Sequence, residues 1–245
     1  MEMIFKMFEY LPRLGPGDRE STLKALSMIK DLPENPLILD IACGKGEQTI
    51  GLLENTNSKI IATDVYDPFL DCLSDKLKSK GLQNRVEIKN MSMTDLDFDK
   101  ESFDLIWSEG AIDIMGFKNG LSKWKPILKK NGYIVVSNIT WFKNREVVPK
   151  EVKAFLEGYV HKIFTTEDYI KIIEELGYKY IDSFKLPESS WWKFFNPFLE
   201  KKDELLKNFE NNKAGIDIVK DFSEQINIYR KYSEYYGYVF YIMQK

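Results

Sequence analysis

A short glycine-containing segment carries residue types that could hold a ligand against the main chain. Residues 40–46 are Asp-Ile-Ala-Cys-Gly-Lys-Gly, and they follow an apolar run that starts at residue 37. Ala42, Gly44 and Gly46 are small, so a ligand can approach the backbone there. A helix that begins after Gly46 would turn its free N–H groups and its positive end towards an anionic group. The segment is therefore predicted to be a ligand-binding turn between a strand and a helix.

An acidic residue closes a second apolar run, 18 residues after Gly46. This residue, Asp64, is suited to accept hydrogen bonds from both hydroxyls of a ribose. Together with the turn it indicates a site for a nucleoside-type cofactor. The glycine spacing differs from the G-x-G-x-x-G of dinucleotide sites, and Glu47 stands where a P-loop would continue with lysine and a hydroxyl residue. Both of those phosphate-binding interpretations are disfavoured.

Strand-like and helix-like segments alternate along the chain and should position these residues. Strands are predicted at 37–42, 58–64, 85–90, 103–108, 133–140, 178–186 and 238–243. Helices are predicted at 19–30, 48–54, 68–80, 121–130, 167–176 and over most of 187–234. Such alternation is typical of a parallel sheet with helices on both faces. Because right-handed crossovers bring the strand carboxyl ends to one rim, Gly44, Asp64 and Ser108 should converge there.

These motifs resemble those of class I S-adenosylmethionine-dependent methyltransferases. Residues 40–46 resemble motif I, and Asp64 resembles the acid of the second strand. Residues 103–108, Phe-Asp-Leu-Ile-Trp-Ser, and residues 127–136 are similar to the family's fourth-strand motif and to its passage into the fifth strand. The resemblance covers about residues 36–140 and is closest to the small-molecule branch, such as the quinone-biosynthesis C-methyltransferases. It implies an α/β, Rossmann-like, doubly wound and mostly parallel seven-stranded sheet with the last strand antiparallel, plus a helical cap.

The resemblance implies S-adenosyl-L-methionine as cofactor and in-line transfer of its methyl group to a small-molecule acceptor. Asp64 would bind the ribose, Gly44 and Gly46 would pass the methionine part, and Ser92 and Met93 would flank the adenine. The cofactor-binding residues carried over by resemblance are Asp40, Ala42, Gly44, Gly46, Asp64, Ser92, Met93, Ser108 and Glu109.

The chain departs from the family pattern at two of these positions. Ala42 replaces the first glycine of motif I, and as a small residue it should preserve binding. Ser92 stands where the family often has an acid that faces the adenine amine. Contact with the adenine would then depend on a hydroxyl or the backbone, together with the Met93 side chain.

Two side chains are candidates for catalysis, although methyl transfer needs a general base only when the nucleophile arrives protonated. Glu109 lies at the predicted rim, where it could act as a base, orient the acceptor or bind the cofactor amine. His161 is the sole histidine, the side chain whose unperturbed pKa is near neutral, but a structural or surface role is the alternative. Trp141, Trp191 and Trp192 are candidates for the wall of an acceptor site, with core packing as the alternative.

Composition excludes several other classes of protein. The chain has 245 residues, of which 44% are hydrophobic and 30% charged, as in an ordinary globular domain. A net charge of -3 disfavours an extended nucleic-acid interface. Two cysteines and one histidine predict neither a disulfide scaffold nor a metal site. Without an apolar run of about 20 residues or a signal-like leader, no membrane span is expected and a cytoplasmic location is the default.

The expected organisation is one methyltransferase domain over residues 1–245. It comprises an N-terminal lid or helix (1–33), in which Arg19 could approach the cofactor carboxylate, a core (34–186), a helical cap insertion (187–235) and a last strand (236–245). An RNA or protein methyltransferase, which would need a basic face, and a non-catalytic S-adenosylmethionine-binding protein are the alternatives. The identity of the acceptor and the oligomeric state, a homodimer included, stay open.

Overall fold

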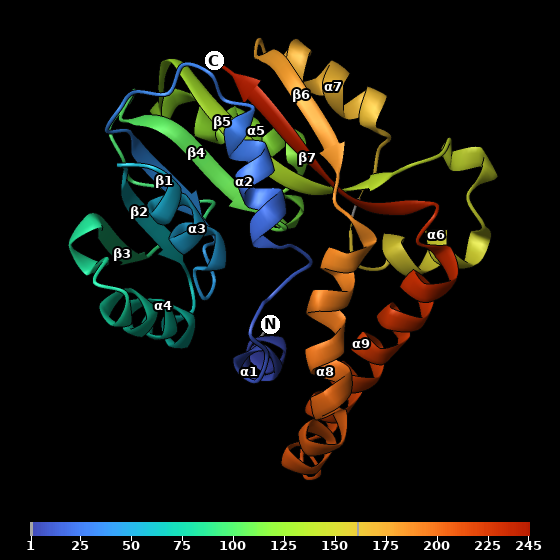
Figure 1. Ribbon diagram of the computed structural model, residues 1–245. Coiled ribbons are helices and arrows are strands. Elements are labelled where there is room, and N and C mark those ends of the chain that lie inside the picture. The colour runs from blue at the N-terminus through green and yellow to red at the C-terminus, as the bar shows by residue number, and fades with distance from the viewer. Residues whose placement is uncertain (1, 161) are drawn as a thin grey trace.

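The computed structural model describes residues 2–160 and 162–245. In this part of the chain a seven-stranded sheet runs in the order β3-β2-β1-β4-β5-β7-β6 (Figure 1). Its strands are β1 (Leu37–Ile41), β2 (Lys59–Asp64), β3 (Val86–Asn90), β4 (Phe103–Glu109), β5 (Leu128–Trp141), β6 (Lys179–Lys185) and β7 (Tyr236–Gln244). The helices are α1 (Glu2–Glu9), α2 (Arg19–Ser27), α3 (Glu47–Asn55), α4 (Asp67–Ser79), α5 (Phe117–Trp124), α6 (Lys150–Glu157), α7 (Thr166–Glu175), α8 (Glu188–Asn208) and α9 (Lys213–Tyr232).

The strand directions confirm the predicted fold class. Strands β3, β2, β1, β4 and β5 pair in parallel, whereas β7 runs antiparallel to both β5 and β6. Strand β1 lies between β2 and β4, so the chain order of the strands reverses beside it. Ligands of open α/β sheets bind at the carboxyl ends of the strands next to such a reversal. The turn after β1 therefore occupies the place where a binding site is expected.

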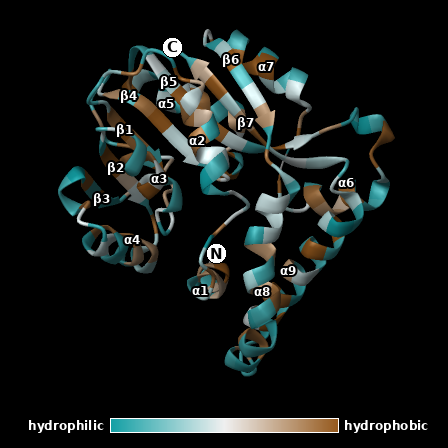
Figure 2. Ribbon diagram, viewed as in Figure 1, coloured by the Kyte–Doolittle hydropathy of each residue, from teal (hydrophilic) through white to brown (hydrophobic). Residues whose placement is uncertain are grey.

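The sheet is buried on both faces, which explains why its central strands are almost wholly apolar (Figure 2). Alternate residues of β1 belong to different clusters: Ile38 belongs to one that includes residues of α3, α4, α8 and α9, and Leu39 to one that includes residues of α5 and α7. Helices α8 and α9 extend as a pair beyond the sheet (Figure 1). Helix α1 bridges α4 and α8, since the Phe5 ring lies 5.7 Å from Phe69 and the Phe8 ring 6.1 Å from Phe194.

The predicted helix at 121–130 is wrong in its second half. Helix α5 spans Phe117–Trp124, and residues 128–130 already belong to β5. Pro126 explains the early end, because proline donates no backbone hydrogen bond and disfavours continuation of a helix. The carbonyls of Pro126 and Ile127 accept instead from the N–H groups of Glu101 and Ser102. Helices α1 and α6 are short and were not predicted, and α2 ends at Ser27 rather than at residue 30.

Candidate functional site

The turn after β1 has a backbone conformation that requires small residues. Ala42, Gly44 and Gly46 all have positive φ, at 56°, 53° and 78°. A Cβ on Gly46 would lie 2.1 Å from Leu73 Cδ1, so a side chain there is excluded sterically. Ala42 adopts the left-handed conformation without being glycine, at a cost of about 1 kcal/mol. The conformation of the turn thus allows a ligand to approach its backbone closely.

Asp64 at the end of β2 is joined directly to this turn. Its Oδ2 accepts from the Gly44 N–H at 2.9 Å, and its Oδ1 accepts from the N–H groups of Val65 (2.8 Å) and Tyr66 (3.2 Å). Burial raises the pKa of Asp64 despite these donors. Val65 is 48% exposed, an unusual position for valine and one that the sequence interpretation missed. The structure brings Gly44 and Asp64 together, with an apolar surface beside them.

Asp40 lies beneath the turn rather than in it. Its carboxylate is fully buried and accepts from Thr49 Oγ1 at 2.5 Å and from Gln48 Nε2 at 3.2 Å. Gln48 Nε2 also donates to the Cys43 carbonyl at 3.2 Å. Burial raises the pKa of Asp40 to about 7. Asp40 therefore anchors α3 to the turn, and no ligand contact follows from its position.

Glu109, at the end of β4, is a buried carboxylate with incomplete pairing. Its Oε1 accepts from Thr22 Oγ1 at 2.7 Å and from Trp107 Nε1 at 2.9 Å. Its Oε2 lies 3.8 Å from the Arg13 guanidinium and has no hydrogen-bond partner. Burial raises the pKa of Glu109, while Arg13 opposes the shift. The geometry leaves one carboxylate oxygen free to accept a hydrogen bond at the rim.

Residues 10–18, which we call the N-terminal strap, lie across the turn. Lys45, 8% exposed, donates to the carbonyls of Phe8 (2.9 Å), Glu9 (2.8 Å) and Leu11 (2.6 Å), where α1 passes into the strap. Leu14 covers the turn, since a Cβ on Gly44 would lie 2.6 Å from Leu14 Cδ1. Lys45 thus connects the turn to α1, and the strap covers the turn from above.

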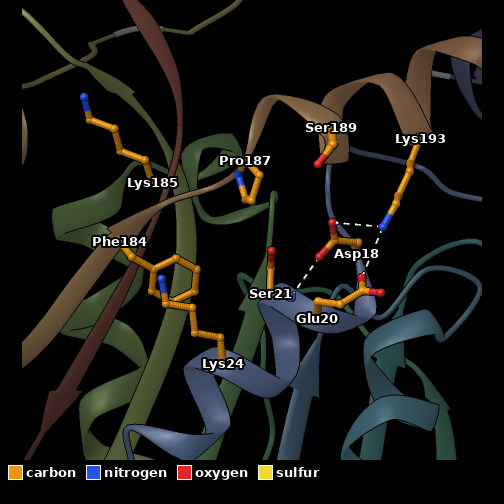
Figure 3. Close-up of a pocket in the computed structure, with 9 residues that line it drawn as sticks. All are labelled: Asp18, Glu20, Ser21, Lys24, Phe184, Lys185, Pro187, Ser189 and Lys193. Atoms are coloured by element: carbon orange, nitrogen blue, oxygen red, sulfur yellow. Dashed lines mark hydrogen bonds and ion pairs between the residues drawn. The ribbon is translucent and has the colours of Figure 1, made fainter.

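The far end of the strap is fastened to α8, beside a cavity of about 250 Å³ (Figure 3). Asp18 accepts from the Ser21 N–H at 2.8 Å, as the N-cap of α2, and from the Ser190 hydroxyl of α8. Lys193 lies 3.3 Å from the same carboxylate. Although burial opposes it, these donors lower the pKa of Asp18 to about 2. Asp18 therefore stays ionised and holds α2 and α8 together.

We expect Lys45→Met to loosen α1 and the strap without unfolding the sheet. Charge-assisted hydrogen bonds contribute about 1.5–3 kcal/mol each, and the substitution leaves three carbonyls without their shared donor. Hydrogen–deuterium exchange should rise in residues 2–14 and stay unchanged in β5. Lys100→Met at an exposed position is the matched control. Unchanged protection of α1 in the Lys45 variant would contradict this role.

The remaining predicted cofactor residues lie along the same rim. The Met91 N–H donates to the Asp64 carbonyl at 2.9 Å, which places the segment after β3 beside the end of β2. In this segment Ser92 Oγ lies 2.8 Å from Thr94 Oγ1, and the Met93 carbonyl accepts from the Trp124 indole at 3.1 Å. Ser108 in β4 is fully buried, and its hydroxyl has no partner. Their roles towards a cofactor stay predictions.

The three predicted acceptor-site tryptophans differ in their surroundings. Trp191 is 2% exposed, stacks on Tyr229 at 4.2 Å between ring centroids, and lies 5.2 Å from the Tyr238 ring of β7. Trp192 donates to Glu188 on its own helix at 3.2 Å, and its ring centroid lies 6.3 Å from that of Tyr229. Trp141 is buried and lines a cavity of about 880 Å³ formed with residues 142–145, 157, 162–165, 167 and 168. Substrate binding by these residues stays a prediction, and His161 lies outside the described residues.

Arg19 is not near the turn. Its guanidinium pairs with Glu54 of α3, and Arg13 takes the position beside Glu109 instead. Arg13, Thr22 and Lys45 were missed because nothing in their local sequence indicates a contact with the rim. Within residues 2–160 and 162–245, no cluster of potential metal ligands occurs and no helix is long and apolar enough to cross a membrane.

Comparisons with known proteins agree with this geometry. A family model described as a methyltransferase domain matches residues 38–132. The chain is 30% identical over 128 residues to a demethylmenaquinone methyltransferase of Bacteroides fragilis, covering 50% of this chain and 51% of the relative. It is 22% identical to an uncharacterised protein of Haemophilus influenzae, covering 70% of this chain and 69% of the relative. The chain spans about half the length of several of the curated relatives it matches.

The fold has close counterparts among solved structures. An S-adenosylmethionine-dependent methyltransferase of Geobacter sulfurreducens, described in complex with S-adenosyl-L-homocysteine, superimposes with a TM-score of 0.84. The match covers 99% of this chain and 97% of that protein at 15% identity. At this identity the likeness shows a common fold.

Proposed function

Since the chain belongs to the class I S-adenosylmethionine-dependent methyltransferase family, we propose that it transfers a methyl group from S-adenosylmethionine to a small molecule. The observation that carries the proposal is the hydrogen bond between the Gly44 N–H and the Asp64 carboxylate. It joins the ends of two adjacent parallel strands, β1 and β2, at 2.9 Å. That is the place where a nucleoside and the group attached to it would lie side by side.

The residues present fit such a cofactor. Asp64 offers carboxylate oxygens to a ribose, and the exposed Val65 offers an apolar surface to a base. A Cβ on Gly44 would intrude into the contact with Leu14, so the turn forms a narrow cradle beneath the strap. The Arg13 guanidinium and the amino end of α3 supply positive charge for a carboxylate. The proposed cofactor thus finds partners for its ribose, its base and its carboxylate.

When bound, the cofactor would supply a methyl group that is activated for transfer by the positively charged sulfonium sulfur. The protein's part is to exclude water and to align the acceptor. The strap and α8, joined through Asp18 and Ser190, close the site on the side of β7. Glu109, with its free oxygen, is the candidate to orient the acceptor or accept its proton, and Trp191 is the candidate to wall the site. The proposal keeps the division into an N-terminal lid or helix (1–33), a core (34–186), a helical cap (187–235) and a last strand (236–245).

A small acceptor is favoured over RNA or protein by the acidic balance of the chain, with a net charge of -3. The similarity to a demethylmenaquinone methyltransferase also supports it. The acceptor class and a cytoplasmic location belong to the proposal.

The test is calorimetry with S-adenosylmethionine, S-adenosylhomocysteine and NAD, followed by transfer from radiolabelled S-adenosylmethionine to a panel of small metabolites. We expect micromolar binding of both sulfur compounds and none of NAD. Binding without transfer to any member of the panel would favour a non-catalytic S-adenosylmethionine-binding protein. Failure of both sulfur compounds to bind would overturn the proposal.

A further inference from the structure

A carboxylate that the proposed site does not yet use lies just beyond β4. Asp113 belongs to a short 3-10 helix, Ile112–Ile114, which follows the left-handed turn at Gly110 and packs against β5. The residue is partly exposed, but its Oδ1 is buried and has no hydrogen-bond partner. Strand β4 is the neighbour of β1, so Asp113 extends the same rim away from the turn after β1.

The surroundings of Asp113 leave its charge uncompensated. No lysine or arginine of residues 2–160 and 162–245 forms an ion pair with it, and burial raises its pKa to about 6. The negative charge of Asp113 contributes to raising the pKa of Tyr238 and Tyr169, so both phenols lie within its electrostatic reach. Tyr238 lies against the turn before Asp113, since a Cβ on Gly110 would be 3.1 Å from its ring. A desolvated carboxylate without a partner is unfavourable as an ion, so it either takes up a proton or is stabilised by a ligand that supplies a cation.

Resting on the proposed methyltransferase function, we propose that Asp113 binds an amine of the methyl acceptor and takes its proton, so that the enzyme methylates nitrogen. A protonated amine would supply Asp113 with both a hydrogen-bond donor and a positive charge, whereas a neutral hydroxyl would supply only the donor. The Tyr238 ring provides aromatic surface beside this place, because it lies against the turn at Gly110, and the Trp191 ring lies 5.2 Å from Tyr238. Carboxylate and aromatic faces together are the usual receptor for an ammonium group.

The reaction balances with the groups at hand. The ammonium proton moves to Asp113, and the nitrogen lone pair so released forms the bond to the methyl carbon. The carbon–sulfur bond breaks, and its electron pair stays on sulfur, which becomes the neutral thioether of S-adenosylhomocysteine. The product is a methylated ammonium, and Asp113 returns its proton to solvent through its exposed side. No oxidant or metal is needed.

The experiment uses fluorine NMR titrations of the full chain saturated with S-adenosylhomocysteine. The probes are para-fluorobenzylamine, para-fluorobenzyl alcohol and para-fluorobenzoate, which share one ring and differ in the donor group. We expect the amine to bind best, and Asp113→Asn to weaken it by about tenfold or more, the loss typical of a charged hydrogen bond. Asp97→Asn, at an exposed aspartate in the loop between β3 and β4, should leave binding unchanged.

Several results would overturn the inference. They are equal binding of amine and alcohol, preference for the benzoate, no binding of the amine to the wild type, or an amine affinity that is the same in Asp113→Asn. A loss of S-adenosylmethionine affinity with intact S-adenosylhomocysteine affinity in Asp113→Asn would assign the carboxylate to the sulfonium instead. Calorimetry of S-adenosylhomocysteine separates these failures from failure of the proposed function, which would abolish binding of that compound to the wild type itself.

Discussion

Asp64→Ala should weaken binding of S-adenosylhomocysteine by about a hundredfold or more, the equivalent of losing two charge-assisted hydrogen bonds. In the wild type the carboxylate would accept from the ribose while it holds the Gly44 N–H at 2.9 Å. The alanine variant therefore loses a ligand contact and a support of the turn in one step. Isothermal titration calorimetry at constant ionic strength measures the change.

Two controls make this result specific. Asp97→Ala removes an exposed carboxylate and should bind as the wild type does. Asp64→Asn keeps the shape and one acceptor oxygen, so its affinity should fall between those of the wild type and Asp64→Ala. The loss of affinity must occur in a protein that keeps the wild-type circular dichroism spectrum and a cooperative thermal transition. If a folded Asp64→Ala protein bound the cofactor with wild-type affinity, Asp64 would not belong to the site. The main observation that supports a cofactor site at the turn would then be lost.

The parts of the site that were predicted from the sequence are those whose positions are determined by neighbouring residues in the chain. Gly46 is needed where the chain turns from β1 into α3, and Asp64 ends an apolar strand, so both can be recognised from neighbouring residues. Burial of a parallel sheet on both faces similarly leaves long apolar runs, which is why most strand positions were predicted to within two residues. The helical spacing of residues 121–130 predicts a longer helix than α5, and Pro126 ends that helix early.

The parts that were not predicted depend on contacts between distant segments. Lys45 donates to carbonyls more than 30 positions earlier in the chain, and Thr22 donates to Glu109 across 87 positions. No spacing rule connects such residues. Asp113 was missed for a different reason, since what distinguishes it is the lack of a partner, and that property exists only in the folded molecule.

The buried Asp40 should make the protein less stable as the pH rises. An unfolded aspartate has a pKa of 3.8, and burial raises the pKa of Asp40 to about 7 in the folded protein. Between these values the native state retains a proton that the unfolded state releases, so the free energy of unfolding falls with pH. A difference of about three pKa units corresponds to about 4 kcal/mol lost between pH 4 and pH 8. Asp64, Glu109 and Asp113 add in the same direction, because burial raises their pKa values too.

Asp40→Asn isolates the contribution of this one group. The amide cannot ionise and its oxygen can still accept from Thr49, but its NH2 group then faces the Gln48 amide, which cannot rotate without losing its hydrogen bond to the Cys43 carbonyl. We expect the variant to be less stable than the wild type by about 1 kcal/mol at pH 5, where the wild-type carboxyl is protonated. At pH 8 it should be more stable by a few kcal/mol, since it avoids a buried charge. Urea unfolding followed by tryptophan fluorescence at both pH values measures the difference, with Asp97→Asn as control. Equal pH dependence in the wild type and in Asp40→Asn would mean that Asp40 is ionised in the folded protein at no cost, and that the turn after β1 is held by a charge rather than by a neutral hydrogen-bonded carboxyl.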